Sequence, residues 1–144
     1  MSTSRTATAL VLDTNVVLDW LVFRDAAARP LDAALRSGLW HWHATTAMRM
    51  ELELVLTYSS LAPWSPQTED VLATWATWVR PIEARAPPLS SPLRCTDPDD
   101  QKFIDLALQL GDCTLLSRDR AVLKLARRAR PFGLTILAPE RWTP

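Results

Sequence analysis

Short apolar runs rich in β-branched residues alternate with segments of helical periodicity along the chain. The runs are Thr8 to Leu12, Trp40 to Ala44, Val79 to Ile82, Cys113 to Ser117 and Leu134 to Leu137. Strands joined by helical crossovers lie parallel in one sheet, whereas antiparallel strands are usually joined by short turns. The alternation therefore predicts an α/β protein built from βαβ units around a parallel sheet.

Capping residues and apolar periodicity predict the helices between these strands. We expect helices at Val16 to Leu21, at Leu31 to Arg36 before Gly38, from a cap at Thr45 or Thr46 to about Tyr58, from Ser65-Pro66 to Trp78, from Asp97-Pro98 to Gly111, and at Arg120 to Ala129. The stretch from Ala84 to Leu93 holds three prolines and is predicted to be a loop.

Length and composition limit what the chain can be. Its 144 residues are long enough for one domain, residues 1–144, with a real core, and 48% of them are hydrophobic. Cys95 and Cys113 are too few for a disulfide framework, and no signal-peptide pattern or membrane-spanning run occurs, so we expect a soluble cytoplasmic protein. Sixteen basic residues balance sixteen acidic ones, which excludes a general electrostatic attraction to nucleic acid.

Two of the predicted strands lead to an aspartate. Asp13 follows Leu12 directly, and Asp119 ends the sequence Leu-Leu-Ser-Arg-Asp. If the first and fourth strands are neighbours at the switch point of a doubly wound sheet, both acids border one crevice. Taken alone, Asp119 is equally well explained as the N-cap of the helix that begins at Arg120.

Helical periodicity selects two further acids. Glu51 lies on one apolar stripe with Met48, Leu52, Val55 and Leu56, whereas Glu53 falls on the opposite side. In the same way Asp100 shares a stripe with Phe103, Ile104, Ala107 and Leu108. Asp97 is predicted to be an N-cap with Pro98 at the first helical position. Helix-dipole stabilisation is the alternative explanation for Asp100.

Four converging carboxylates at Asp13, Glu51, Asp100 and Asp119, with no Lys or His nearby, would repel one another unless a cation lay between them. Oxygen ligands suit Mg²⁺ or Mn²⁺, and one or two such ions can activate a water for phosphodiester hydrolysis. We expect Asn15 and Ser117 to support the site with hydrogen bonds.

The order and spacing of these motifs resemble the PIN domain family of small metal-dependent ribonucleases. The resemblance rests on Leu12-Asp13-Thr14-Asn15, Glu51-Leu52 with Val55-Leu56, Asp97-Pro98-Asp99-Asp100 with Phe103 and Ala107, and Leu116-Ser117-Arg118-Asp119. It implies a three-layer α/β/α fold around a central, mostly parallel sheet of four to five strands. It also implies a metal-binding quartet at Asp13, Glu51, Asp100 and Asp119. Many relatives are toxins of toxin-antitoxin pairs, so a small antitoxin protein and a homodimer are expected partners.

Two other groups of side chains bear on function. Arg120, Lys124, Arg127 and Arg128 lie on one side of the predicted last helix, where they would hold an RNA backbone or form an ordinary solvated face. His41 and His43 alternate on one face of a strand; packing explains them better than a metal does. The seven tryptophans show no stacking repeat, which favours core and interface packing over base stacking.

Two other functions compete with a ribonuclease. A phosphohydrolase of the haloacid dehalogenase type also begins with an apolar strand and an aspartate, but it needs a second aspartate where this chain has Asn15. A module of PIN type that binds RNA or protein without cutting is the second alternative, and the intact quartet argues against it.

Overall fold

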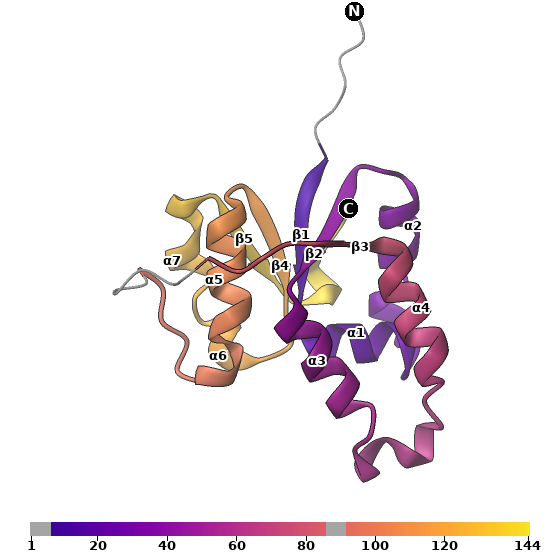
Figure 1. The fold of residues 1–144 in the computed structure, drawn as a ribbon. Helices are drawn as coiled ribbons and strands as arrows, with labels where there is room; N and C mark the ends of the chain where they lie inside the picture. Colours follow the sequence, from indigo (N-terminus) through magenta and orange to yellow (C-terminus); the bar gives the residue numbers. More distant parts are fainter. Residues whose placement is uncertain (1–6, 86–91) are drawn as a thin grey trace, which may run out of the picture.

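The computed structural model describes residues 7–85 and 92–144 (Figure 1). Five strands form one sheet in the order β3-β2-β1-β4-β5, and every neighbouring pair is parallel. The strands are β1 (Thr8–Leu12), β2 (Trp40–Ala44), β3 (Val79–Pro81), β4 (Cys113–Leu116) and β5 (Leu134–Leu137). All five predicted strands are confirmed, with ends that differ by at most one residue.

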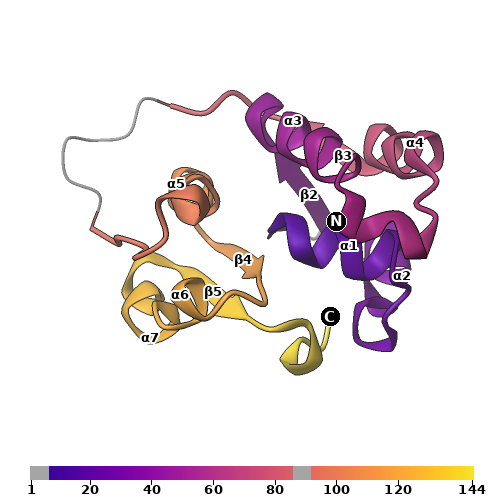
Figure 2. The ribbon, with the colours of Figure 1, turned by 90° about the horizontal axis from the view of Figure 1, so that it is seen from below.

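Helices cover both faces of this sheet. They are α1 (Thr14–Leu21), α2 (Pro30–Arg36), α3 (Thr46–Val55), α4 (Thr68–Trp78), α5 (Gln101–Leu110), α6 (Arg120–Leu123) and α7 (Ala126–Ala129). Seen from below, α1, α2 and α4 lie on one face and α5, α6 and α7 on the other, while α3 extends away from the end of β2 (Figures 1 and 2). The expected three-layer α/β/α arrangement is confirmed.

The strand order reverses between β1 and β4. The chain moves from β1 to β2 to β3, and α5 then returns it to the far side of β1. Leu12 pairs with Leu116, and the Asp13 N–H donates to the Leu116 carbonyl at 3.1 Å. The ends of β1 and β4 therefore lie side by side at the switch point, as predicted, where open α/β sheets bind their ligands.

Central strands of this sheet are apolar because both of their faces are covered. Leu10, Val11, Leu115 and Leu116 have no exposed surface. Trp42 is also fully buried, between Trp20 and Trp75 at ring-centroid distances of 5.9 and 4.9 Å. These tryptophans confirm the expected packing role, while Trp64 remains 55% exposed on the surface.

Two helix boundaries differ from the prediction. Helix α3 ends at Val55 rather than near Tyr58, because Tyr58 is already extended (φ −66°, ψ 136°) and leads into the 3₁₀ helix η2 (Ser59–Trp64). Ser65-Pro66 does not start α4, because Ser65 has a left-handed backbone (φ 45°), and α4 follows Gln67 instead. Short 3₁₀ turns of this kind leave little trace in apolar periodicity.

The segment from Arg120 to Ala129 is not one helix. The Leu125 N–H bonds to the Val122 carbonyl at 3.0 Å, three residues back instead of four, and this tighter turn separates α6 from α7. The predicted amphipathicity is nevertheless confirmed, because Val122 and Leu125 are buried while the basic side chains are exposed.

The remaining 3₁₀ turns are η1 (Ala26–Ala28), η3 (Pro98–Asp100), η4 (Arg130–Phe132) and η5 (Pro139–Arg141). Asp97-Pro98 therefore opens η3, and α5 begins only at Gln101. The predicted loop from Ala84 to Leu93 includes residues 86–91, which lie outside the described residues. Within 7–85 and 92–144, no helix is both long and apolar enough to cross a membrane.

Candidate metal centre

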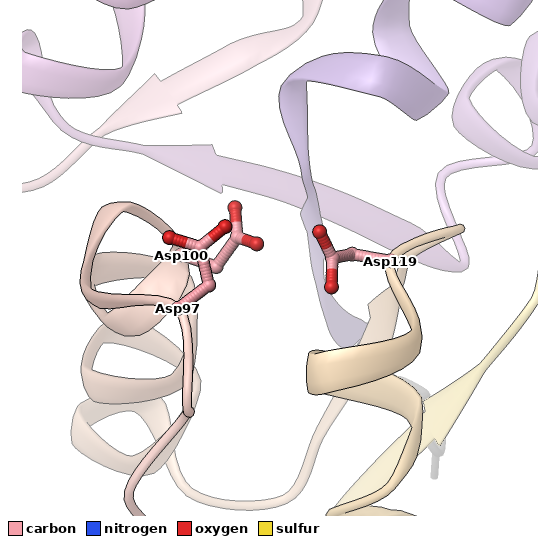
Figure 3. Close-up of side chains that lie close together, drawn as sticks. All are labelled: Asp97, Asp100 and Asp119. Atoms are coloured by element: carbon pink, nitrogen blue, oxygen red, sulfur yellow. The ribbon is translucent and has the colours of Figure 1, made fainter.

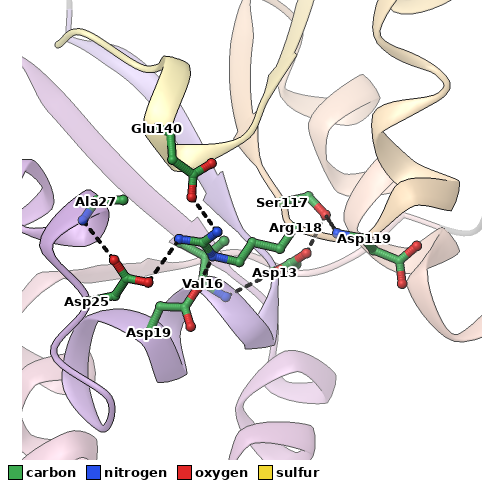
Figure 4. Close-up of polar contacts among 9 residues, drawn as sticks. All are labelled: Asp13, Val16, Asp19, Asp25, Ala27, Ser117, Arg118, Asp119 and Glu140. Carbon is green, nitrogen blue, oxygen red and sulfur yellow. Dashed lines mark hydrogen bonds and ion pairs between the residues drawn. The ribbon is translucent and has the colours of Figure 1, made fainter.

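Asp13 lies at the end of β1 and is only 2% exposed. Its Oδ1 accepts a hydrogen bond from the Val16 N–H at 2.9 Å, which caps α1, and its Oδ2 accepts one from the Ser117 hydroxyl (Figure 4). Burial raises the pKa of Asp13, against the lowering effect of these hydrogen bonds. The strand end thus holds a carboxylate in a fixed orientation.

Ser117 connects the ends of the two central strands. It is fully buried, donates to Asp13, and accepts a hydrogen bond from the Asp119 N–H at 3.0 Å. Asp119 in turn accepts from the Ala121 N–H at 2.7 Å, so its alternative role as the N-cap of α6 is confirmed. An N-cap uses only one of the two carboxylate oxygens of Asp119, so the other oxygen can still bind a metal ion.

Three aspartates come together beside these strand ends. Asp97, Asp100 and Asp119 each offer a carboxylate oxygen, and these oxygens all lie within 4.8 Å of one another (Figure 3). Asp97 is the predicted N-cap, accepting from the Asp99 N–H at 3.0 Å, but the sequence did not identify it as a site residue. Asp97 could have been identified as a site residue from its N-cap position, because it begins the turn that carries Asp100.

The surroundings of these three carboxylates suit a divalent cation. Asp100 Oδ2 is buried and has no hydrogen-bond partner among the described residues. The pKa of Asp100 is raised to about 7, first by burial, then by the neighbouring Asp119, and also by the charges of Asp97 and Asp13. Within the described part of the chain none of the three forms an ion pair. The all-oxygen donor set matches Mg²⁺ or Mn²⁺.

Glu51 contacts a lysine, Lys102, whereas we expected it to lie among the other carboxylates. Its Oε1 lies 3.1 Å from the Lys102 ammonium, and its other oxygen accepts a hydrogen bond from the Thr14 hydroxyl. The expectation that no Lys lies near the acidic residues was therefore wrong. Periodicity did separate the two glutamates correctly, because Glu53 is exposed and pairs with Arg49 on the outer side of α3.

The predicted supporting residues differ in their contacts. Ser117 makes the hydrogen bonds described above, whereas Asn15 is exposed, and no side-chain hydrogen bond joins it to the residues described. Thr14, its neighbour, makes the contact to Glu51 that the sequence did not indicate.

Among the residues that the structure describes, neither the basic residues of α6 and α7 nor the two histidines form an ion pair. Arg120, Lys124, Arg127 and Arg128 are exposed. His41 and His43 have ring centroids 6.5 Å apart, and the pKa of each is lowered, first by burial and also by the charge of Arg80. Neither histidine belongs to the group of metal-capable side chains found among the described residues.

Arg118 was not identified from the sequence and is the most connected side chain near the site. Its guanidinium forms ion pairs with Asp19 on α1, with Asp25 at 3.3 Å, and with Glu140 on η5 (Figure 4). Because it lies between Ser117 and Asp119 in the chain, these pairs anchor the loop that carries both residues.

A comparison with protein-family models matches the PIN domain over residues 9–121. The chain belongs to the PIN domain family. PIN domains are generally nucleases that use divalent metal ions, and the matched range contains every candidate carboxylate described above. The haloacid dehalogenase alternative has no support, because position 15 carries an exposed asparagine rather than an acid. No curated protein matches the chain.

Proposed function

We propose that this PIN domain is a metal-dependent endoribonuclease that hydrolyses RNA phosphodiester bonds with a metal-activated water and without a covalent protein intermediate. The observation that carries the proposal is the convergence of Asp97, Asp100 and Asp119, together with a buried Asp100 oxygen that has no hydrogen-bond partner among the described residues. PIN nucleases generally act on RNA, which supports the choice of substrate.

In this proposal Asp97, Asp100 and Asp119 hold Mg²⁺ or Mn²⁺, with Asp13 as a further carboxylate at the end of β1. A bound divalent ion supplies a nucleophile by lowering the pKa of its water and stabilises negative charge on the phosphate. Asp13 is held in place by the Val16 N–H, the Ser117 hydroxyl and the backbone of Arg118. Ser117 acts as a positioning residue for both Asp13 and Asp119, and Asn15 is available to hydrogen-bond water at the surface.

The test is cleavage of labelled structured and unstructured RNAs with Mg²⁺ or Mn²⁺, with EDTA as the metal-free reference. We expect Asp100→Asn and Asp119→Asn each to lower the cleavage rate about 100-fold, as loss of a charge-stabilising group does in other active sites. Asp99→Asn is the matched control, because Asp99 is exposed, lies in the same turn, and is outside the cluster.

Two outcomes would contradict the proposal. Cleavage that survives both cluster substitutions, or persists in EDTA, would show that these carboxylates are not the active site. Binding of RNA without cleavage of any RNA or DNA under either metal would instead identify a non-catalytic binding module.

We also propose that the chain is the toxin of a toxin-antitoxin pair. The Asp97-Pro98-Asp99-Asp100 and Glu51-Leu52 motifs support this, because they resemble the family subgroup described as toxin components. A small antitoxin protein, a homodimer and a cytoplasmic location belong to the same proposal. We expect a short adjacent gene that encodes a DNA-binding fold, and we expect its product to co-purify with this chain. We also expect expression of this chain without that product to arrest growth. A free-standing gene without toxicity would contradict it.

A further inference from the structure

The ammonium of Lys102 lies among oxygen atoms at the start of α5. It is 3.1 Å from Glu51 Oε1 and 2.5 Å from the Asp99 carbonyl oxygen, and it lies 4.8 Å from the ring centroid of Phe103. The Lys102 and Glu51 side chains are each 29% exposed. The position of this cation is therefore fixed by contacts from α3, η3 and α5.

This ion pair contacts two of the chain segments that carry the candidate carboxylates. Lys102 follows Asp100 by two residues, and Glu51 is held by the hydroxyl of Thr14, the residue next to Asp13. Glu51 is not among the carboxylates that converge on one point. In this arrangement the positive charge beside Glu51 comes from the protein itself.

A phosphate approaching the centre meets several carboxylates and needs a cation to offset their repulsion. An ammonium has three N–H donors, and Glu51 and the Asp99 carbonyl accept from two of them. The third donor is available to a ligand, and the side chain is exposed enough to be reached from solvent. Cations of this kind bind nucleic-acid phosphates irrespective of base sequence.

We propose that Lys102 is a substrate-binding residue that donates to a phosphate of the RNA beside the carboxylate cluster, and that Glu51 orients this ammonium. The inference rests on the proposed function in that it takes RNA as the substrate. It adds Lys102 to the predicted site, with Glu51 as the residue that positions its ammonium.

The first measurement is the affinity for a fluorescein-labelled RNA by anisotropy in EDTA, repeated over a range of salt concentrations. Lys102→Met should weaken binding about tenfold at low salt, the value of one charge-assisted hydrogen bond. It should also reduce the slope of log affinity against log salt by about 0.7, as expected for one phosphate contact to a single strand. Lys102→Arg should keep most of the RNA affinity and most of the salt slope, since arginine keeps the positive charge.

Arg49→Met is the matched control for this measurement. Arg49 pairs with Glu53 at 2.9 Å on the outer side of α3, so the substitution also removes one cation from one ion pair with a glutamate. It should leave RNA affinity and the salt slope unchanged. Circular dichroism confirms that each variant folds.

The second measurement is Mn²⁺ binding by calorimetry, which does not depend on cleavage. Lys102→Met should retain an affinity close to that of the unaltered protein, whereas Asp100→Asn should lose binding. In kinetic assays Lys102→Met should raise KM more than it lowers kcat, because it removes binding and leaves the metal centre intact.

The results separate this inference from the proposed function. If Lys102→Met binds RNA with the affinity and salt slope of the unaltered protein, the substrate-binding role is wrong. If Lys102→Met loses Mn²⁺ as fully as Asp100→Asn, Lys102 maintains the metal centre itself and the substrate-binding role is wrong. Lost RNA affinity in Lys102→Met together with an absence of cleavage by the unaltered protein would support the inference and contradict the nuclease. An unaltered protein that binds no RNA would overturn both.

Discussion

Asp100 shows most directly how the carboxylates affect one another. Its pKa is about 7, because burial and the neighbouring Asp119, Asp97 and Asp13 all disfavour its charged form. In the metal-free protein Asp100 therefore keeps a proton to a higher pH than an ordinary aspartate does. A divalent ion that binds here must displace that proton, so metal affinity is expected to rise with pH.

This raised pKa predicts how stability depends on pH. In EDTA the folded protein binds the Asp100 proton more tightly than the unfolded chain, whose carboxyl titrates near its usual value of 3.8. The stabilisation is complete below pH 3.8 and is lost as the pH rises through about 7. The midpoint of urea unfolding, after subtraction of the Asp100→Asn profile, should thus fall between pH 5 and 7.5.

Saturating Mn²⁺ should reverse this trend, because the ion binds the deprotonated carboxylates and stabilises the folded state more at high pH. Asp99→Asn provides the control and should keep the pH profile of the unaltered protein. If Asp100→Asn and the unaltered protein had the same profile in EDTA, the electrostatic description of the cluster would be wrong.

Individual site residues could be predicted only where the sequence pattern of a single strand or helix indicates where the side chain points. Asp13 and Asp119 follow strands, and Asp100 lies on an apolar helix stripe, so local sequence indicates their direction. Lys102 and Arg118 are different, since they contact residues 51 and 99 positions away in the chain. Long, flexible side chains can reach several partners, and one sequence does not show which partner each reaches.

At the scale of elements, the central strands β1 and β4 were predictable because burial on both faces makes them continuous apolar runs. The ends of the helices were less predictable from the sequence. The early end of α3 at Val55 and the break after Leu123 depend on single hydrogen bonds and on short 3₁₀ turns, which apolar periodicity does not resolve. These differences leave the positions of β1 and β4, and so the site, unchanged.

The elements α6 and α7 present the exposed basic residues next to Asp119. If they hold the RNA backbone, the double substitution Arg127→Gln with Arg128→Gln should weaken RNA binding at low salt and reduce the salt slope by about 1.4, or 0.7 for each phosphate contact to a single strand. Anisotropy in EDTA measures both. The matched control is the double substitution Arg29→Gln with Arg36→Gln. Both residues are exposed; Arg29 precedes α2 and Arg36 is its last residue. An unchanged slope would identify α6 and α7 as an ordinary solvated surface.

Across the whole molecule, Arg118 joins the two sides of the switch point. Its ion pairs connect the loop after β4 to Asp19 on α1, to Asp25 before η1, and to Glu140 on η5 (Figure 4). Asp19 is the least exposed of these partners, with 13% of its side chain accessible, and burial raises its pKa despite the opposing effect of Arg118. The network therefore connects the end of the chain to its first helix.

Arg118→Met should lower the free energy of unfolding by about 1–3 kcal/mol, less than for a fully buried pair because the partners are partly exposed. Urea denaturation measures this change. Arg36→Met is the control, since Arg36 pairs with Asp32 at an exposed i, i+4 position and should contribute under about 1 kcal/mol. Equal effects of the two substitutions would show that the network contributes no more than a surface ion pair.

The overall topology was predictable because right-handed βαβ crossovers allow few arrangements of five parallel strands. The family match ends at residue 121, yet β5 pairs with β4 along its whole length, from Leu134 to Leu137. We therefore expect residues 1–144 to unfold as one cooperative unit. What local sequence left undetermined is which acidic side chains share one cation.

The position of a bound metal ion decides whether these three aspartates form the metal centre. A crystal of the protein soaked in Mn²⁺ and measured near the manganese absorption edge should give an anomalous difference peak in direct contact with carboxylate oxygens of Asp97, Asp100 and Asp119. The same measurement on Asp100→Asn should give a weak peak or none. A peak elsewhere, or no peak in the unaltered protein at saturating Mn²⁺, would contradict the assignment of this cluster as the metal centre of a nuclease.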